Sequence, residues 1–366
     1  MKKVVIFTSS LNPGGIERSI LRFLRYAGDI ADYTIVVRNG RTGELYDDYK
    51  ALGVNIVYQS VGYFNLHKWI KIYRFLIKNK FDIVCDYTAN FSGITLWLSK
   101  IAGIKSRVAF YRSSTNHYGK SRIKDLYNNW LNNLVYNNAT KILANSKAAL
   151  HFFFKSRNID IPLFDVLYNG IEANEFSKEY NTVEIKNELN LPINSVVVGH
   201  TGRYSWPKNF PLLVSIAENI TEKYENVYFV FCGRNTDDKF IEDYPDVTRN
   251  PKIKILGYQA DVPKILSIYD IFVFPSTTEG QPNSLIEALF SGLPIVASNI
   301  EPIKECVPES MVSELIDPHC KEEFIKRVSY LIENENVRKE SDFSGWAKDR
   351  YDSKILFDKF IFYLGI

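Results

Sequence analysis

The sequence of 366 residues lacks the features that mark several protein classes. It has no run of about 18 apolar residues, so no segment is predicted to span a membrane. Its four cysteines form no Cys-x-x-Cys pair and its five histidines are dispersed, which disfavours a zinc site. Buried thiols in a reducing cytosol account most simply for the cysteines, so a cytoplasmic protein is expected. The net charge is only +3, so no nucleic-acid partner is expected.

What the sequence does contain is an alternation of short apolar runs with longer amphipathic stretches. This pattern predicts parallel strands that are covered by helices on both faces of a sheet. The apolar run near the start is too short for an export signal and predicts a first strand. The polar stretch from Glu172 to Asn190 separates two such series, and we interpret it as the connection between domains.

A chain of this length is too long for one typical core. The expected fold is therefore two doubly wound, Rossmann-like α/β domains of residues 1–172 and 173–349, with a helix at about 350–366 crossing back to the first domain. The predicted strands are Val4–Thr8, Thr34–Val37, Asn55–Tyr58, Ile83–Asp86, Arg107–Tyr111, Lys141–Ala144 and Phe164–Tyr168, then Val196–His200, Tyr228–Cys232, Ile253–Leu256, Ile271–Phe274 and Pro294–Ser298.

Two acidic residues flank a loop that follows the predicted buried strand Ile271–Phe274. Glu279 precedes the loop and Glu287 lies in the first turn of the next helix; between them stand Gly280, Gln281, Pro282, Asn283 and Ser284. Ligands of open α/β sheets bind at the carboxyl ends of strands, where backbone N–H groups suit anionic oxygens and carboxylates suit hydroxyls. A capping box beginning at Ser284 would explain Glu287 alone, and Glu279 alone would be an ordinary loop acid.

A second loop joins the strand Val196–His200 to the next helix and carries Gly202, Arg203, Lys208 and Asn209. The planar fork of an arginine and the point charge of a lysine together suit a diphosphate. The alternative is a solvated basic loop.

A third loop, Asn12–Arg18, contains Gly14 and Gly15 directly before a predicted helix. The two glycines allow a ligand to approach the backbone, and a helix N-terminus favours negative charge. The loop is not the Gly-x-Gly-x-x-Gly fingerprint, which disfavours a nicotinamide oxidoreductase.

Together these elements resemble the retaining glycosyltransferases of family 4, which have the GT-B fold. The most specific are the Glu-x7-Glu element at 279–287 and the Gly-Arg-x4-Lys-Asn element at 202–209. Further matches are Pro-Gly-Gly-Ile-Glu-Arg at 13–18, Asn-Gly-Ile-Glu at 169–172, Phe-Pro-Ser at 274–276 and Gly-Leu-Pro-Ile-Val-Ala-Ser at 292–298. Within the family, bacterial enzymes that build capsule, O-antigen or exopolysaccharide on a lipid carrier look most similar.

The resemblance implies transfer of a sugar from a nucleotide-diphosphate donor, UDP being preferred to GDP, to a glycan or lipid-linked saccharide. It implies that Arg203 and Lys208 neutralise the leaving diphosphate, that Glu287 holds the ribose, and that Glu279 and the amides of 280–283 address the donor sugar. It also places two further groups around the donor: Gly14 and Gly15 near the phosphate, from the opposite domain, and Gly257, Tyr258 and Val262 near the base.

No metal or other cofactor is expected. The Asp-x-Asp motif that metal-dependent transferases often carry is missing from the sequence, and the two cations can replace the metal charge.

Two positions depart from the family pattern. Where relatives often carry a histidine near the acceptor, this chain has Arg112, with His117 further along the same loop; either residue is a candidate on the acceptor side. The hinge aspartate of the family is Glu172 here.

The segment Phe64–Lys80 is aromatic and basic. Such a helix can lie on an anionic membrane surface, or it can be a domain helix with a buried face and a solvated basic face. A peripheral position on the inner face of the cytoplasmic membrane is therefore one expectation. The rival functions are a nucleotide-sugar epimerase or phosphorylase of the same fold, and a noncatalytic nucleotide-sugar-binding scaffold.

Overall fold

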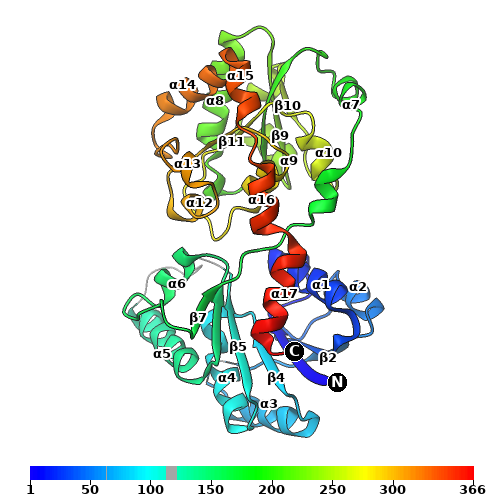
Figure 1. Ribbon diagram of the computed structural model, residues 1–366, viewed down its shortest axis with the longest axis vertical. Helices are drawn as coiled ribbons and strands as arrows, with labels where there is room; N and C mark the ends of the chain where they lie inside the picture. Colours follow the sequence, from blue (N-terminus) through cyan, green and yellow to red (C-terminus); the bar gives the residue numbers. More distant parts are fainter. Residues whose placement is uncertain (63, 113–121) are drawn as a thin grey trace. The chain divides into compact units, whose positions relative to one another are not determined.

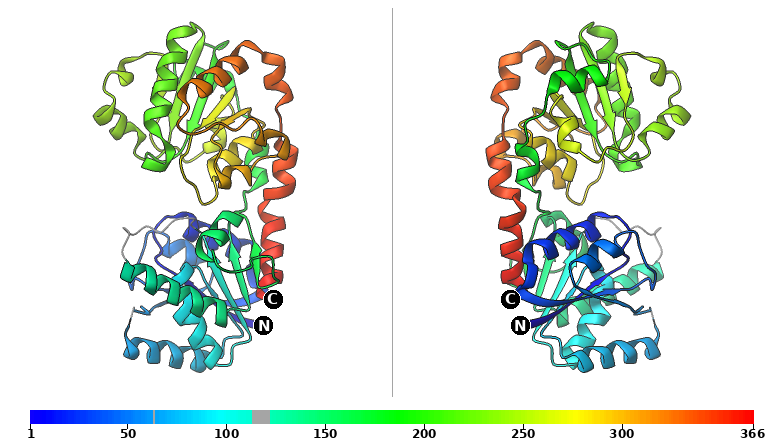
Figure 2. Two further views of the ribbon diagram at one scale, coloured as in Figure 1. Left: turned by 90° about the vertical axis from the view of Figure 1, so that its left-hand side faces the viewer. Right: turned by 90° about the vertical axis from the view of Figure 1, so that its right-hand side faces the viewer.

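The computed structural model describes residues 1–62, 64–112 and 122–366 (Figure 1). The chain divides into two compact units, the first made of residues 1–170 and 353–366 and the second of residues 171–352. Each unit is built on one parallel sheet, and helices lie on both faces of each sheet (Figure 2). The predicted fold class, two doubly wound α/β domains, is confirmed.

The sheet of unit 1 has the strand order β3-β2-β1-β4-β5-β6-β7, and every neighbouring pair is parallel. Its strands are β1 (Lys2–Thr8), β2 (Ala31–Val37), β3 (Asn55–Tyr58), β4 (Ile83–Asp86), β5 (Ser106–Tyr111), β6 (Lys141–Ala144) and β7 (Phe164–Val166). These match the predicted strands to within a few residues at each end.

The helices of unit 1 lie between and after these strands. They are α1 (Gly15–Ala27), η1 (Gly28–Ile30), α2 (Tyr46–Ala51), α3 (Leu66–Asn79), η2 (Ala89–Phe91), α4 (Ser92–Ile101), α5 (Arg122–Asn138), α6 (Lys147–Phe153) and α17 (Ser353–Leu364). Successive residues of β1 serve opposite faces of the sheet, because side chains alternate along a strand. Val4 and Ile6 belong to the core shared with α1 and α17, whereas Val5 and Phe7 belong to the core shared with α3, α4 and α5.

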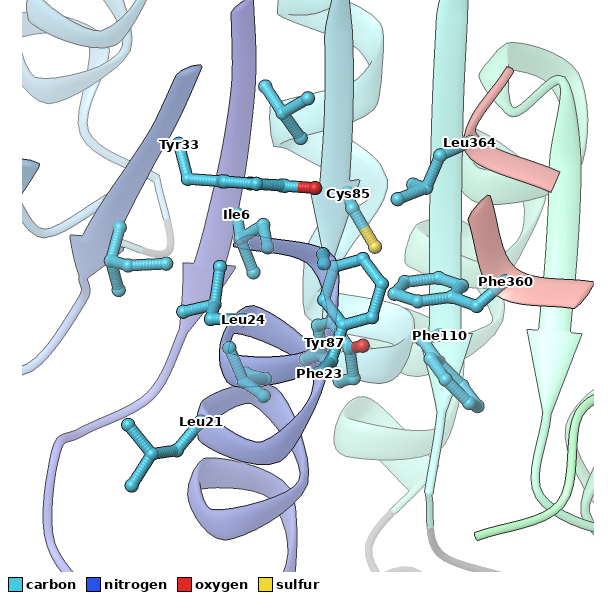
Figure 3. Packing of buried hydrophobic residues seen from close by; sticks show 14 of the residues in the cluster. Ile6, Leu21, Phe23, Leu24, Tyr33, Cys85, Tyr87, Phe110, Phe360 and Leu364 are labelled. Atoms are coloured by element: carbon cyan, nitrogen blue, oxygen red, sulfur yellow. The ribbon is translucent and has the colours of Figure 1, made fainter. Parts of the chain in front are cut away.

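Helix α17 completes the first of these two cores. Its Phe360 is buried, with its ring centroid 4.7 Å from that of Phe23 in α1 and 6.0 Å from that of Phe110 in β5 (Figure 3). Residues 353–366 are therefore part of unit 1 although unit 2 precedes them in the chain.

The sheet of unit 2 has the order β10-β9-β8-β11-β12, again with parallel neighbours. Its strands are β8 (Val196–Thr201), β9 (Val227–Cys232), β10 (Ile253–Ile255), β11 (Ile271–Phe274) and β12 (Ile295–Ala297). Its helices are η3 (Ala173–Ser177), α7 (Thr182–Glu188), η4 (Trp206–Lys208), α8 (Phe210–Lys223), α9 (Thr236–Asp243), η5 (Val247–Arg249), α10 (Val262–Leu266), α11 (Asn283–Phe290), α12 (Glu301–Lys304), α13 (Glu309–Val312), α14 (Lys321–Glu333), α15 (Glu335–Glu340) and α16 (Ser344–Tyr351).

The segment 172–190 is not the plain connection that its polarity predicts. It contains η3 and α7 and belongs to unit 2. The side chain of Asn181 caps α7 by accepting a hydrogen bond from the Glu184 amide, and Ile185 is buried. Helix α7 is short and has a single buried residue, so the sequence contains no apolar stripe that would predict it.

Within the described ranges no helix combines the length and the apolar character needed to cross a bilayer. All four cysteines are free thiols, and Cys85, Cys232 and Cys306 are buried, as the sequence predicts.

Candidate functional site

The topology of unit 2 creates a switch point between β8 and β11. The chain proceeds from β8 to β9 and β10 on one side of the sheet, then returns to place β11 and β12 on the other side. In open α/β sheets the loops diverge at such a point, and ligands bind beyond the carboxyl ends of the two strands. The loop after β8 is 202–209 and the loop after β11 is 275–282, so the two most specific sequence motifs flank this point.

The first of these loops is held in a defined shape. After the turn at Ser205, η4 carries Lys208, whose amide donates to the Ser205 carbonyl at 3.0 Å. Asn209 then takes a left-handed conformation, with φ of 56°, and starts helix α8. The strand, turn, cation and helix succeed one another as the sequence predicts.

An ion pair joins the two loops. The Lys208 Nζ lies 2.7 Å from the Glu279 Oε1, and the two side chains are only 15% and 12% exposed. The same ammonium lies 4.4 Å from the ring centroid of Phe274, the last residue of β11. A backbone hydrogen bond of 2.8 Å from the Thr277 amide to the Pro207 carbonyl ties the loops a second time. The structure thus brings together a cation and an acid that are 71 residues apart.

The other two charged residues of the motifs behave differently. Arg203 is exposed and forms no ion pair with any of the described residues. Glu287 is half-buried in α11. Burial raises the pKa of the Cys232 thiol at the end of β9 to about 12, and the charge of Glu287 acts in the same direction.

The capping-box explanation of Glu287 is wrong. It requires Ser284 at the N-cap, but α11 begins at Asn283, with Pro282 at the N-cap and no side-chain cap. The amide of Ile286 donates to the Pro282 carbonyl at 3.1 Å. Gln281 and Pro282 are buried, and Gly280 is partly exposed.

Three glycines at the ends of β8, β9 and β10 bring the backbones into contact. The Gly202 amide donates to the Cys232 carbonyl at 2.8 Å, and the Gly233 amide donates to the Gly257 carbonyl at 2.7 Å. A Cβ atom at Gly233 would lie 1.9 Å from the Gly202 carbonyl oxygen, so only glycine fits there. The sequence alone does not indicate this role of Gly233, because it depends on the backbone of a neighbouring strand.

The residues predicted to lie near the base include Gly257, the glycine of this cluster that follows β10. Gly257 has a left-handed φ of 63°, and a Cβ atom there would be 2.4 Å from an Asp237 carboxylate oxygen. Tyr258 is exposed, with the Arg234 guanidinium carbon 5.8 Å from its ring centroid. Val262 is the first residue of α10 and partly exposed. A flat aromatic ring and an arginine next to an open backbone turn can stack on a planar ligand.

In unit 1, Gly14 is the N-cap of α1, and the neighbouring Glu17 side chain explains why this position is a glycine. A Cβ atom at Gly14 would lie 2.5 Å from the Glu17 Oε2, whereas a Cβ atom at Gly15 would have no neighbour within 4 Å. Glu17 is buried and accepts a hydrogen bond from the Ser10 hydroxyl at 3.3 Å. Burial raises the pKa of Glu17, while hydrogen bonds and the charge of Arg112 act in the opposite direction.

Arg112 follows β5 and lies in the same unit as Glu17. Its guanidinium donates to the Asn169 side-chain oxygen, and its Cζ is 5.4 Å from the Phe110 ring centroid. Burial lowers the pKa of Arg112, and the Glu17 carboxylate counters this effect. His117, the other acceptor-side candidate, lies outside the described residues.

In the part of the chain that the structure describes, no three His, Cys, Asp or Glu side chains are grouped so as to hold a metal ion. The polar groups of the site are instead a lysine, two carboxylates, an exposed arginine and backbone amides.

Comparison with known proteins identifies the family. The model of the family described as Glycosyltransferase Family 4 matches residues 13–175, and the model described as Glycosyl transferases group 1 matches residues 181–345. The capsular polysaccharide biosynthesis glycosyltransferase CapH of Staphylococcus aureus is 27% identical over 312 residues, which cover 82% of each chain. An Escherichia coli galactosyltransferase, named as acting between UDP-Gal and α-D-GlcNAc-diphosphoundecaprenol, is 28% identical over 63% of this chain and 61% of its own.

A solved structure agrees with the fold. The structure of Anabaena HepE in complex with UDP superposes with a TM-score of 0.82 over 100% of both chains, at 19% sequence identity. Unit 1 coincides with most of the first family match and unit 2 contains the second. The chain belongs to the family 4 glycosyltransferases and has their GT-B fold.

Proposed function

We propose that this glycosyltransferase moves a hexosyl or N-acetylhexosaminyl group from a UDP-sugar to a glycan or lipid-linked saccharide, with retention of the anomeric configuration and without a metal ion. In this proposal unit 2 binds the donor and unit 1 the acceptor. The observation that carries it is the Lys208–Glu279 ion pair at the switch point of unit 2, which sets a cation and an acid where a sugar and its diphosphate would meet.

The proposed chemistry depends on electrostatics. When a glycosyl–phosphate bond breaks, negative charge grows on the leaving oxygen and positive charge grows on the sugar. Lys208 and Arg203 stabilise the first, and Glu279 lies where it can stabilise the second. A fixed charge aimed at a growing opposite charge contributes roughly 3–4 kcal/mol. In other transferases a divalent cation supplies this charge; here the two side chains do.

Lys208 is suited to this role because its ammonium already lies at the switch point before the donor arrives. Its ammonium is held between the Glu279 carboxylate and the Phe274 ring, so little reorganisation is needed when a diphosphate binds. Arg203 is exposed and is proposed to fold onto the diphosphate from solvent, forming paired hydrogen bonds.

The remaining donor contacts follow the ends of the strands. Glu287 is proposed to accept hydrogen bonds from the ribose hydroxyls, and the amides of 280–283 to contact the sugar. The uracil is proposed to lie against Gly257, Tyr258 and Val262, where the exposed Tyr258 ring and the Arg234 guanidinium offer stacking partners.

The acceptor is proposed to be a saccharide on a lipid diphosphate, of the kind named for the Escherichia coli relative. Surface polysaccharide assembly is the setting in which the relative CapH is named. Arg112, a partly exposed cation after β5, is the acceptor-side candidate that the structure describes.

We propose in addition that helix α3 lies on the inner face of the cytoplasmic membrane. Ile72 and Leu76 are buried in the core of unit 1, as expected for a domain helix with one buried face. The exposed apolar side chains are instead Leu66, Ile70 and Ile77, spaced by four and seven residues and hence on one face of the helix. Lys71, Arg74 and Lys78 are exposed beside this stripe, a pattern that suits anionic lipid.

Analysis of the products tests the transferase proposal. The protein is incubated with UDP-hexoses or UDP-N-acetylhexosamines and a lipid-linked saccharide, with and without EDTA. Release of UDP with growth of the acceptor, an α-linkage from an α-donor and indifference to EDTA are expected. An isomerised donor without acceptor growth would identify an epimerase, and donor binding without turnover on any acceptor would identify a scaffold.

A further inference from the structure

A histidine side chain occupies the place where β8 and β11 separate. The two strands pair through Val198 with Ile271 and Gly199 with Phe272, and the pairing ends there. At the next residue the His200 Nδ1 lies 2.9 Å from the Val273 carbonyl oxygen. A carbonyl oxygen only accepts, so Nδ1 carries the proton. The imidazole thus continues the ladder of hydrogen bonds at the point where the backbones move apart.

Aromatic rings hold this imidazole in a fixed orientation. The ring centroids of Phe272 and Phe274 lie 6.0 and 5.8 Å away, with interplanar angles of 15° and 25°. The Phe210 ring meets the imidazole edge-on, at 85°. His200 has no exposed surface. Burial lowers the pKa of His200 to about 3, and the charge of Lys208 acts in the same direction, so the ring is neutral throughout the physiological range.

The second ring nitrogen is a hydrogen-bond acceptor without a donor. His200 Nε2 is buried and has no hydrogen-bond partner among the described residues. A buried polar atom left without a partner is unfavourable, so a donor that reaches it is favoured. A Cβ atom at Gly202 would lie 2.8 Å from Nε2 and 3.4 Å from the Lys208 Cε. The missing side chain of Gly202 therefore leaves a space that the imidazole nitrogen and the lysine side chain both border.

The chemistry of Nε2 restricts its partner. A neutral Nε2 has a lone pair and no proton, so it can accept from an N–H or O–H group but cannot donate to a phosphate oxygen. The Lys208 ammonium has three N–H groups, of which one meets Glu279. Lys208 is thus a donor with spare N–H groups that borders the same space.

We propose that His200 is a positioning residue for Lys208: when a diphosphate binds at the switch point of unit 2, the Lys208 ammonium donates to His200 Nε2 while it contacts the diphosphate and Glu279. The inference rests on the proposed donor site. The neutral imidazole accepts this hydrogen bond without repelling the negatively charged diphosphate. A second carboxylate in its place would repel the diphosphate. Lys208 then has one acceptor for each of its three N–H groups.

A double-mutant cycle with UDP as the probe tests the proposal. UDP affinity is measured by titration calorimetry for the wild type, His200→Phe, Lys208→Ala and the double variant. His200→Phe keeps a ring between Phe272 and Phe274 but removes both nitrogens. We expect it to weaken UDP binding about tenfold, the value of one hydrogen bond to a charged group, and to have no effect in the Lys208→Ala background. Additive losses, or unchanged affinity in folded His200→Phe, would overturn the proposal.

A second measurement needs no substitution at His200. In ¹⁵N-histidine-labelled protein, the Nε2 resonance of His200 is expected to move upfield when UDP saturates the wild type and to stay in place in Lys208→Ala. A resonance that does not move in the UDP-saturated wild type would overturn the inference while leaving the donor site intact. A wild type that binds no UDP would instead refute the proposed donor, and the inference with it.

Discussion

The Lys208 ammonium and the Glu279 carboxylate form a partly buried ion pair with a separation of 2.7 Å, and they come from loops after two different strands. A cation that is already desolvated and held in place can act on a leaving group without first reorganising water. The pair therefore connects the architecture of the sheet with the chemistry proposed for the site.

Lys208→Ala is expected to lower kcat by about a hundredfold, because the diphosphate loses a fixed charge in the transition state. Initial rates at saturating donor and acceptor measure this effect. Lys223→Ala is the matched control: it removes an exposed lysine of α8 whose partner, Glu333, is 3.5 Å away, and exposed pairs contribute little. Wild-type rates in folded Lys208→Ala would contradict the role assigned to Lys208.

Glu287→Ala is expected to weaken donor binding about a hundredfold, since the ribose hydroxyls would lose a charged acceptor. The KM for the UDP-sugar and the Kd for UDP report the change. Glu222→Ala, an exposed acid of α8, should leave both constants unaltered. If Glu287→Ala kept its UDP affinity, the carboxylate would have to serve something other than the ribose.

Gly233→Ala is expected to destabilise unit 2 by about 1–3 kcal/mol, the usual cost of overpacking, because its Cβ atom would meet the Gly202 carbonyl at 1.9 Å. Urea unfolding measures the loss. Gly345→Ala gives the opposite expectation: no atom lies within 4 Å of its Cβ position in helix α16, so removal of a helical glycine should stabilise by about 0.5–1 kcal/mol. Equal effects of the two substitutions would contradict the close backbone contact.

The buried carboxyl of Glu17 predicts a pH dependence of stability in unit 1. Burial raises the pKa of Glu17 above its usual 4.5, so the native state binds this proton more tightly than the unfolded chain does. Stability then falls as pH rises from about 4.5 through the raised native pKa. Glu17→Gln should remove this part of the fall in urea melts recorded across that window, whereas Glu44→Gln, at an exposed position, should retain it. An unchanged pH profile in Glu17→Gln would show that its pKa is ordinary.

The membrane proposal predicts a charge-dependent affinity for anionic vesicles. Lys71→Glu combined with Lys78→Glu should weaken flotation with phosphatidylglycerol vesicles at low salt by about tenfold or more, at roughly 1 kcal/mol per basic residue near the surface. Lys178→Glu with Lys326→Glu changes the net charge equally at exposed positions of unit 2 and should have little effect. Equal losses in the two double variants, or no binding by the wild type, would remove α3 as the contact surface.

The sequence predicted the strands well because most of them are short buried apolar runs: β4, β6 and β11 begin and end at the predicted residues. The family resemblance assigned Lys208 and Glu279 to one donor site, and both residues follow strands whose carboxyl ends lie at the same edge of the sheet. The strands need only local composition, and the shared edge needs only the rules of strand order.

The contacts of single side chains could not be predicted in this way. Nothing in the sequence indicates that Glu17 fills the space beside Gly14, or that Gly233 touches Gly202. The ring of His200 replaces a backbone donor between two strands, which leaves no periodic signal. Such features depend on where backbones separate or touch, and this is known only once the strands have been paired.

The placement of α17 in unit 1 has a consequence during synthesis. The ribosome makes residues 171–352, a complete unit 2, before it makes the helix that covers Phe23 and Phe110. Until then the nascent unit 1 leaves this aromatic surface uncovered, and exposed apolar surface of this kind makes an incomplete domain prone to aggregate. Unit 2 can therefore finish folding before unit 1, although the synthesis of unit 1 begins first.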